Sequence, residues 1–258
     1  MHIFYSEYLK NYSTYTFGYA IYAVLNEKDS LTDAYNKGFL PFTGPSAYEK
    51  KSRSEIYYLA RSLRIDLNSF SASSENRRIL RKAEPFPMTI SYDEKSAIIH
   101  DRSFQSFCMK YATERFRGGE LDEQRWSYIL ERACGTHIFT FTGDDGKVLG
   151  YVLAGIDEKS VHYWYSFFDT DFMDNFPLGK YMMYKIIEWA KQENKSHIYL
   201  GTCYGNHSLY KVRDFKAVEY FEGDGWSNDV KRLKELCKSD DENRDRDLFK
   251  VQGLRFKV

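Results

Sequence analysis

This sequence of 258 residues has little cysteine, little proline and no excess of either charge. It contains four cysteines, five prolines and 37 basic against 37 acidic residues. No two cysteines form a CxxC pair and no Cys/His cluster has the spacing of a zinc site, so we expect free, reduced and mostly buried thiols and no metal. A net charge of zero excludes a molecule that binds polyanions over its whole surface.

Long apolar runs are also missing. No stretch approaches the roughly 18 apolar residues of a membrane span, and residues 1–6 lack the basic and apolar regions of a secretory signal. With 43% hydrophobic residues and a mean hydropathy of −0.59, the sequence predicts a globular protein of the cytoplasm with no membrane partner. Its length fits one large domain or two small ones.

The charged residues are unevenly distributed along the chain. Residues 49–82 hold nine basic and four acidic residues, whereas residues 222–247 hold nine acidic and six basic ones. A basic face on a neutral protein can meet phosphates, and an ordinary solvated helix surface is the alternative reading.

The N-terminal third alternates between extended and helical patterns. Its periodicity predicts a strand over residues 15–25, a short helix over 31–38 closed by a glycine, and a loop over 38–45. Residues 57–67 form a strand pair or one long strand. Residues 73–82 have the pattern of a capped helix that ends in basic residues.

The remaining chain has a regular order of elements. After extended residues 88–99 come two helices. Three strands follow over 136–142, 148–156 and 161–168, joined by tight turns, one of which contains Asp-Gly. The elements expected after them are a helix over 178–193, a strand over 197–203, a short helix over 208–215, a strand over 217–221 and a helix up to residue 238. This order predicts an α+β or α/β fold of the N-acyltransferase (GNAT-like) type, in which helices flank a mixed, mainly antiparallel sheet. We expect a smaller N-terminal α+β lobe over 1–87, the GNAT-like core over 88–222 and a charged extension over 223–258.

A GNAT-like core that binds coenzyme A needs a (Q/R)xxGx(G/A) loop, whose backbone N–H groups hold the pyrophosphate at the start of a helix. The equivalent residues 174–181 contain one glycine, Gly179, and a proline before the helix. This difference counts against acetyl-CoA as the acyl donor.

Five short patterns occur in order along the chain. The first resembles R-I-x-V-x-x-F-x-x-S-x-S-x-R-R and contains Arg64, Ser73, Arg77 and Arg78. The second resembles Y-x-F-Y-D-P-D and contains Tyr165, Phe167 and Asp169. The others resemble S-L-G-x-Y around Gly179, Y-L-G around Leu200 and Gly201, and M-x-Y-K-x-x-F-x-P-x-E around Tyr210 and Lys211. Their order and spacing over residues 31–82 and 148–221 resemble the aminoacyl-tRNA–protein transferases, the family of arginyltransferases and bacterial aspartate/glutamate leucyltransferases.

One part of the family pattern is missing. Family members carry a cysteine cluster before the first pattern, which binds metal or an iron–sulfur centre in some of them. Residues 52–63 contain no cysteine, and Ala60 stands where one is expected.

The resemblance implies transfer of an amino acid, arginine or leucine, from charged tRNA to the N-terminal α-amine of a protein or peptide with an acidic first residue. Aminoacyl-tRNA is then a co-substrate, and no cofactor is implied. Because the ester is already activated, the enzyme mainly positions the amine and stabilises the oxyanion. The implied catalytic residues are Tyr165, Phe167 and Asp169, with Asp169 on the amino group of the donor amino acid; a turn or helix-cap role is the alternative for Asp169.

The resemblance also implies residues that bind substrate or tRNA. Arg77 and Arg78, with Ser73 and Arg64 in the same pattern, are expected to hold an acidic acceptor side chain or tRNA phosphates. Helix-terminal charge is the alternative role for the arginine pair. Strand ends are expected to supply shape and backbone donors, and Tyr210 with Lys211 to reach the terminal adenosine or phosphates. The residues expected at the strand end and at the turn before the helix are Leu200, Gly201, Thr202 and Gly179.

Two other functions fit the same fold. One is an acetyl-CoA-dependent GNAT N-acetyltransferase with an atypical pyrophosphate loop. The other is a non-catalytic binding module descended from the transferase fold.

Overall fold

The computed structural model describes residues 1–11, 16–43, 55–116, 121–174 and 176–244. The chain divides into two compact units. The split unit combines Met1–Asp66 with Tyr199–Val258, and the continuous unit is Leu67–Ile198. In the ranges just given, no helix is long and apolar enough to cross a membrane.

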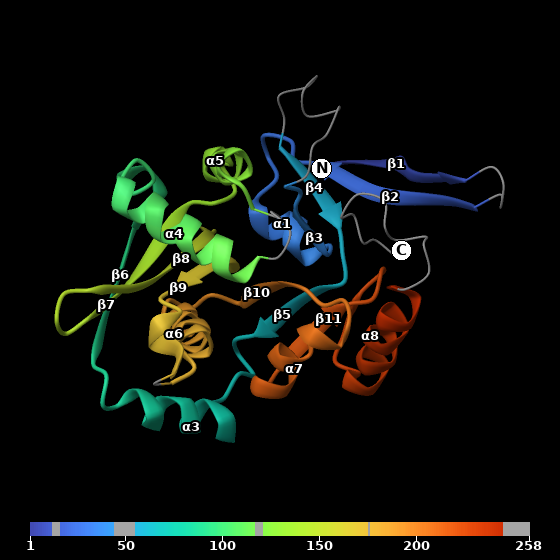
Figure 1. Cartoon of the computed structure of the whole chain (residues 1–258). Coiled ribbons are helices and arrows are strands. Elements are labelled where there is room, and N and C mark those ends of the chain that lie inside the picture. The colour runs from blue at the N-terminus through green and yellow to red at the C-terminus, as the bar shows by residue number, and fades with distance from the viewer. Residues whose placement is uncertain (12–15, 44–54, 117–120, 175, 245–258) are drawn as a thin grey trace. The chain divides into compact units, whose positions relative to one another are not determined.

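The continuous unit is a four-stranded antiparallel meander with helices packed on it (Figure 1). Its strands lie in the order β9-β8-β7-β6. They are β6 (Met88–Glu94), β7 (His137–Gly143), β8 (Val148–Ile156) and β9 (Ser160–Phe168). Its helices are α3 (Ser74–Ala83), α4 (Arg102–Arg115), α5 (Glu123–Glu131) and α6 (Leu178–Gln192), with short 3-10 turns at Lys95–Ala97 and Asp171–Asp174.

Alternation along β8 places helices on both faces of the meander. Tyr151 and Leu153 belong to the core formed with α4 and α5. Gly150 faces α6 instead, where a Cβ atom would lie 2.6 Å from the methyl carbon of Met182. Because successive side chains of a strand point to opposite faces, a strand buried on both sides is apolar at nearly every position, and β8 is.

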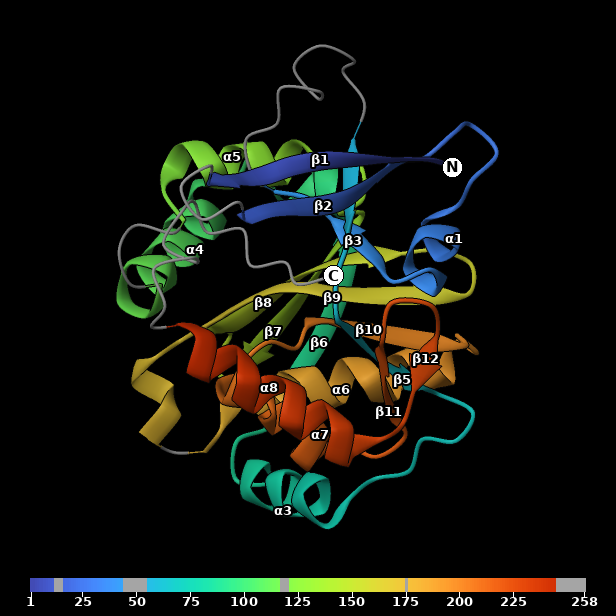
Figure 2. The same ribbon diagram turned by 90° about the vertical axis from the view of Figure 1, so that its right-hand side faces the viewer.

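The split unit contains two groups of strands. One sheet has the order β1-β2-β4-β3, and the other group has the order β12-β11-β5-β10 (Figure 2). Their bounds are β1 (His2–Asn11), β2 (Thr16–Val24), β3 (Phe39–Pro41), β4 (Ile56–Leu59), β5 (Ser62–Asp66), β10 (His197–Thr202), β11 (Val218–Phe221) and β12 (Trp226–Ser227). The helices are α1 (Leu31–Asn36), α7 (Tyr210–Asp214) and α8 (Val230–Arg244), with a 3-10 turn at Asn206–Ser208.

The short helix α1 shows why local sequence determines local structure. Ser30 and Asp33 form a reciprocal capping box at its start, and Gly38 follows its end with a φ of +79°. A left-handed residue after a helix is usually glycine because a Cβ atom is disfavoured there. The predicted helix with its terminal glycine is therefore confirmed.

The predicted class is confirmed as a mixed α+β fold with mainly antiparallel strands flanked by helices. Residues 57–67 form a strand pair, as one of the two predicted alternatives stated. The predicted loop over 38–45 is wrong at Phe39–Pro41, which pairs with β4 as β3. Strands β1 and β12 were not predicted, and α8 extends to Arg244, beyond the predicted end at residue 238. The division at residues 87 and 222 stays a prediction.

Candidate functional site

The end of β10 is held by a lysine from α7. The Lys211 Nζ atom donates to the carbonyl oxygen of Leu200 at 2.6 Å and to that of Thr202 at 3.4 Å. Between these two residues, Gly201 has a φ of +79°, a conformation that other residues rarely adopt. The ring of Tyr210 lies 5.9 Å from the same ammonium. The structure therefore brings five predicted binding residues together, and we call this group the β10 clamp.

The ammonium of Lys211 is removed from water. Burial lowers the pKa of Lys211 to about 8, because a low-dielectric environment disfavours the charged form. The ammonium donates hydrogen bonds to two backbone carbonyls, and no carboxylate among the described residues forms an ion pair with it. Near neutral pH the clamp therefore supplies a positive charge that is partly desolvated and suited to an anionic ligand.

Arg64 has internal partners in the split unit. Its Nε atom donates to Glu219 at 2.7 Å, and its guanidinium lies 4.0 Å from the ring centroid of Trp226. Arg64 and Glu219 are direct partners in the β5–β11 register. This arginine therefore joins two strands, and its expected part in binding substrate stays a prediction.

The aromatic residues of β9 pack inside the continuous unit. Phe167 is only 1% exposed, and its ring lies 4.8 Å from that of Trp126 and 5.7 Å from that of Tyr111. Tyr165 is partly buried and stacks on Phe167 at 6.3 Å. The side chain of Phe167 therefore lies in the hydrophobic core. Any catalytic role of this residue must depend on its backbone or on the shape that it gives to β9.

Asp169 lies directly after β9 and is almost completely enclosed. Its Oδ2 atom is 2.6 Å from the Lys147 Nζ atom, and its Oδ1 atom accepts the backbone N–H of Asp171 at 3.1 Å. The Asp169 side chain is 7% exposed. Hydrogen bonding to Asp169 raises the pKa of Lys147. The predicted carboxylate is therefore present at the strand end, with a lysine as its partner.

A pocket of about 180 Å³ lies beside Asp169. Lys110 from α4 is 3.3 Å from Asp171, and this hydrogen bond raises the pKa of Lys110. The hydroxyl of Thr170 donates to Glu114. The full lining is Phe107, Lys110, Tyr111, Glu114, Lys147, Val148, Phe168, Asp169, Thr170 and Asp171. Charged groups of both signs around this small volume suit a polar ligand group with an amine or a carboxylate.

The predicted cap of α3 is confirmed. The Ser73 hydroxyl accepts the backbone N–H of Asn76 at 3.1 Å, and the Asn76 side chain accepts that of Ser73 at 2.9 Å. Arg78 donates two bonds of 2.7 Å to Glu75, and Lys180 lies 3.6 Å from the same carboxylate. The bond from Arg78 is the largest cause that lowers the pKa of Glu75 to about 2. Ser73 and Arg78 thus have structural partners within α3 and its start.

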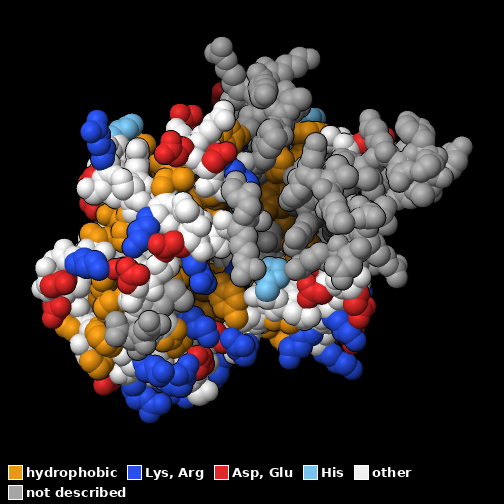
Figure 3. Space-filling view, in the orientation of Figure 1, with side chains coloured by type: hydrophobic (Ala, Val, Ile, Leu, Met, Phe, Trp, Pro, Cys, Tyr) orange, Lys and Arg blue, Asp and Glu red, His pale blue; other side chains and the backbone are white. Residues whose placement is uncertain are grey.

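The exposed side of α3 carries further positive charge. Arg77, Arg81 and Lys82 are exposed, and Lys and Arg side chains gather along the lower edge of Figure 3, where α3 lies. In the part of the chain that the structure describes, none of these three residues forms an ion pair, although Arg77 donates to the carbonyl of Ala72 at 2.8 Å. The basic residues at 50, 51 and 53 lie outside the described ranges. We call residues 77, 81 and 82 the α3 basic face.

Gly179, in the first turn of α6, is required by close packing. A Cβ atom there would lie 2.7 Å from the ring of Phe168. In a coenzyme A loop, the space beside the glycine holds a phosphate. In this protein, the ring of Phe168 lies beside Gly179. This supports packing as one role of Gly179, and its predicted part in binding stays a prediction.

Sequence patterns missed Lys147 and Lys110. The Asp-Gly turn is the sequence signal that could have identified Lys147. The hairpin places the residues after that turn opposite the end of β9, where the carbonyl of Leu149 accepts the backbone N–H of Asp169 at 2.9 Å. Lys110 had only helical spacing as a signal. Nothing in its local sequence identifies its contact with Asp171.

Comparison with known proteins gives one family and several relatives. A family model described as the C terminus of arginine-tRNA-protein transferase matches residues 89–219, just over half of the chain. The aspartate/glutamate leucyltransferase of Stenotrophomonas maltophilia is 26% identical over 179 residues, which cover 64% of this chain and 67% of that protein. The enzyme of the same name from Saccharophagus degradans is 26% identical over 163 residues, or 61% of this chain and 63% of that protein.

Among solved structures, FemX is similar over 80% of this chain and 71% of its own, with 14% identity and a TM-score of 0.48. The chain spans about two thirds of the length of the two leucyltransferases that it matches. The family match begins in β6, includes both strand ends described above, and ends at Glu219, the partner of Arg64. The chain belongs to the arginine-tRNA-protein transferase family.

Proposed function

We propose that this protein transfers an amino acid from charged tRNA to the N-terminal α-amine of a protein or peptide that begins with an acidic residue. The observation that carries the proposal is the family match over residues 89–219. Because the curated relatives are named as aspartate/glutamate leucyltransferases, leucine is the first amino acid to test and arginine the second.

The reaction needs positioning more than new chemistry. The acceptor amine attacks the ester carbonyl of aminoacyl-tRNA, the ester C–O bond breaks, and the proton of the amine ends on the released ribose hydroxyl. Since the ester is already activated, the protein needs no covalent nucleophile and no cofactor beyond its co-substrate. A protein that holds the two substrates in line and stabilises the oxyanion supplies most of the rate enhancement.

We assign two groups of the donor separately, one to the β10 clamp of the split unit and the other to the pocket beside Asp169 in the continuous unit. The partly desolvated ammonium of Lys211, with Tyr210 beside it, suits the terminal adenosine or its phosphate. The carboxylate of Asp169 suits the amino group of the donor amino acid, which then competes with Lys147. We assign the α3 basic face, with Arg78 next to it, to tRNA phosphates or to the acidic acceptor residue.

We further propose a GNAT-like core over residues 88–222, active in the cytoplasm where charged tRNA is found. The meander of β6–β9, followed by α6 and β10, supports this core. The packing of Gly179 against Phe168 argues against acetyl-CoA as the donor.

The test is a transfer assay with pooled labelled aminoacyl-tRNAs against peptides of varied N-terminal residue. We expect incorporation from leucyl-tRNA or arginyl-tRNA into peptides that begin with Asp or Glu. No incorporation from any pool would overturn the proposal, and binding of acetyl-CoA would then favour an N-acetyltransferase.

A double variant tests the assignment of α3 in the same assay. The double variant Arg77→Ala with Arg78→Ala replaces two cations assigned to substrate, and it should lower kcat/KM by roughly a hundredfold or more, since bonds to charged groups are each worth about 1.5–3 kcal/mol. Arg102→Ala, at an exposed position of α4, is the matched control and should transfer normally. An unchanged rate in the double variant removes α3 from the site without affecting the proposed reaction.

A further inference from the structure

Two of the four cysteines lie against each other in the split unit. The sulfur atoms of Cys203, directly after β10, and Cys237, in α8, are 3.7 Å apart. Both side chains are completely buried, and both are free thiols. A disulfide requires about 2.05 Å between its sulfurs, so a small shift of either segment allows the bond. Cys108 and Cys134 belong to the continuous unit.

The surroundings of the pair make its two thiols unequal. Arg61 donates to the carbonyl of Cys203 at 3.2 Å and forms an ion pair of 2.6 Å with Asp240, which lies three residues after Cys237. The contact with the Cys203 sulfur, in which either thiol can donate, and then the positive charge of Arg61 lower the pKa of Cys237. The contact with Cys237, and then burial, raise the pKa of Cys203. Cys237 is therefore suited to attack as a thiolate, and Cys203 to follow as the resolving thiol.

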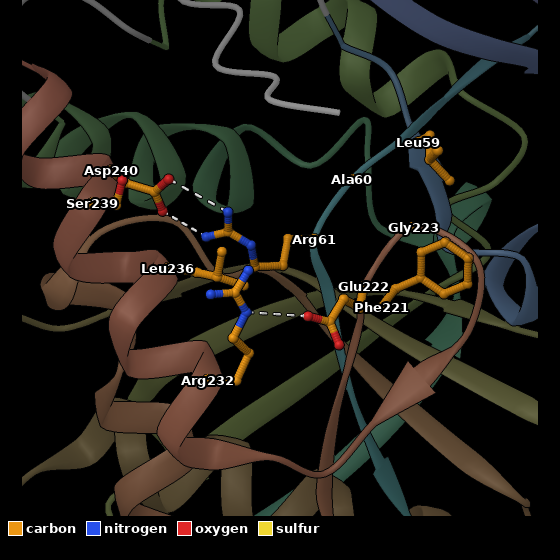
Figure 4. A pocket seen from close by; sticks show the side chains of 10 residues that line it. All are labelled: Leu59, Ala60, Arg61, Phe221, Glu222, Gly223, Arg232, Leu236, Ser239 and Asp240. Carbon is orange, nitrogen blue, oxygen red and sulfur yellow. Dashed lines mark hydrogen bonds and ion pairs between the residues drawn. The ribbon is translucent and has the colours of Figure 1, made fainter.

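A pocket of about 350 Å³ adjoins this part of α8 (Figure 4). Two of its lining residues, Leu236 and Asp240, lie on either side of Cys237 in the helix sequence. Its lining includes the ion pair of Arg232 and Glu222, at 3.5 Å, with both side chains 40% or more exposed. Charges of both signs suit a small zwitterionic reagent. Because Cys237 itself is buried, its reaction requires local opening of α8.

The thiol pair is joined to the β10 clamp by the chain itself. Cys203 follows Thr202, whose carbonyl receives the longer of the two bonds from Lys211, at 3.4 Å. If Cys203 moves toward α8 to form a disulfide, the carbonyl of the preceding Thr202 moves with it. The end of β10 then loses part of the geometry that the bond from Lys211 fixes.

We propose that Cys203 and Cys237 form a redox-modification site, at which a small disulfide such as oxidised glutathione converts the thiol pair into a disulfide and slows the reaction at the β10 clamp. The Cys237 thiolate attacks one sulfur of the reagent and releases one glutathione thiolate, which leaves a mixed disulfide. Cys203 then gives up its proton, attacks the sulfur of Cys237 and releases the second glutathione. The protein loses two electrons and two protons, and oxidised glutathione becomes two molecules of glutathione.

The first test is chemical and uses the full chain. The folded protein is equilibrated with mixtures of reduced and oxidised glutathione, remaining thiols are alkylated, and peptides are mapped by mass spectrometry. We expect the loss of two alkylatable thiols and a cross-linked peptide that contains Cys203 and Cys237. Retention of all four thiols in the oxidising mixtures, or a cross-link through Cys108 or Cys134, would overturn the proposed site.

The second test concerns the effect on transfer, which rests on the proposed function. The oxidised protein should transfer about fivefold or more slowly than the reduced protein, and a thiol reductant should restore the rate. Cys237→Ser should transfer like the reduced protein in both mixtures, whereas Cys134→Ser should respond as the wild type does. Should Cys237→Ser fail to fold, the oxidised and re-reduced wild type decide the question alone.

The outcomes separate the two proposals. A mapped disulfide with an unchanged transfer rate overturns the regulatory part. Absence of transfer even from the fully reduced protein overturns the proposed function and leaves the mapped disulfide standing.

Discussion

Lys211 donates hydrogen bonds to two backbone carbonyls and has a pKa of about 8, below the ordinary value of 10.5. Between these two pH values the unfolded chain binds a proton that the folded chain has lost. The free energy of unfolding therefore rises with pH across this window, because stability increases wherever the unfolded state binds more protons. Burial raises the pKa values of Tyr184 and Tyr199 from 10.0 to about 12, so their opposite effect on stability begins only near pH 10, at the upper end of the window.

This reasoning predicts the behaviour of one variant. Between pH 8 and pH 9.5, the wild type should gain up to about 1 kcal/mol of unfolding free energy per pH unit relative to Lys211→Met. Urea unfolding at several pH values, followed by fluorescence, measures the difference. Lys216→Met, at an exposed position close by, should run parallel to the wild type. Parallel curves for wild type and Lys211→Met would show that the ammonium is solvated.

At this scale, the sequence named candidate residues but not their surroundings. The resemblance named Lys211 and Asp169 because their patterns are local, and their roles stay predictions. It could not show that Lys211 donates to backbone carbonyls, that Lys147 pairs with Asp169, or that Phe167 is a core residue. Each of these facts depends on segments that are distant in sequence.

Among the elements, α3 begins at a capping box formed by Ser73 and Asn76. Ser73→Ala removes the acceptor for the backbone N–H of Asn76 and should lower the free energy of unfolding by about 1 kcal/mol. Hydrogen exchange should quicken at the first turn of α3. Ser71→Ala, at an exposed position just before the helix, is the control. If both variants unfold alike, the cap contributes no stability.

Elements with a strong periodic pattern were predicted with nearly correct ends, among them β7, β8, β9 and α6. Three strands were missed, β1, β3 and β12, and the last two are only three and two residues long. A strand this short has too few residues to show alternation, and pairing with a neighbour forms it: Phe39 opposite Leu59, and Trp226 opposite Phe221.

For the whole molecule, a net charge of zero coexists with the α3 basic face. If residues 77, 81 and 82 each neutralise one phosphate, the logarithm of the tRNA association constant should fall against log salt with a slope of about −3. Filter binding over a range of salt concentrations measures this slope. Arg77→Ala with Arg81→Ala should reduce its magnitude by about 2, while Arg102→Ala should leave it unchanged. A slope near zero would exclude phosphate contacts as the basis of binding.

The split unit has a consequence for synthesis on the ribosome. Residues 63–65 of β5 pair with residues 218–220 of β11, and the whole continuous unit lies between them in the chain. At roughly 5–20 residues per second, the first segment waits on the order of ten seconds for its partner strand to be made. The continuous unit can collapse during that interval, while β5 is an unpaired edge that a chaperone has time to cover.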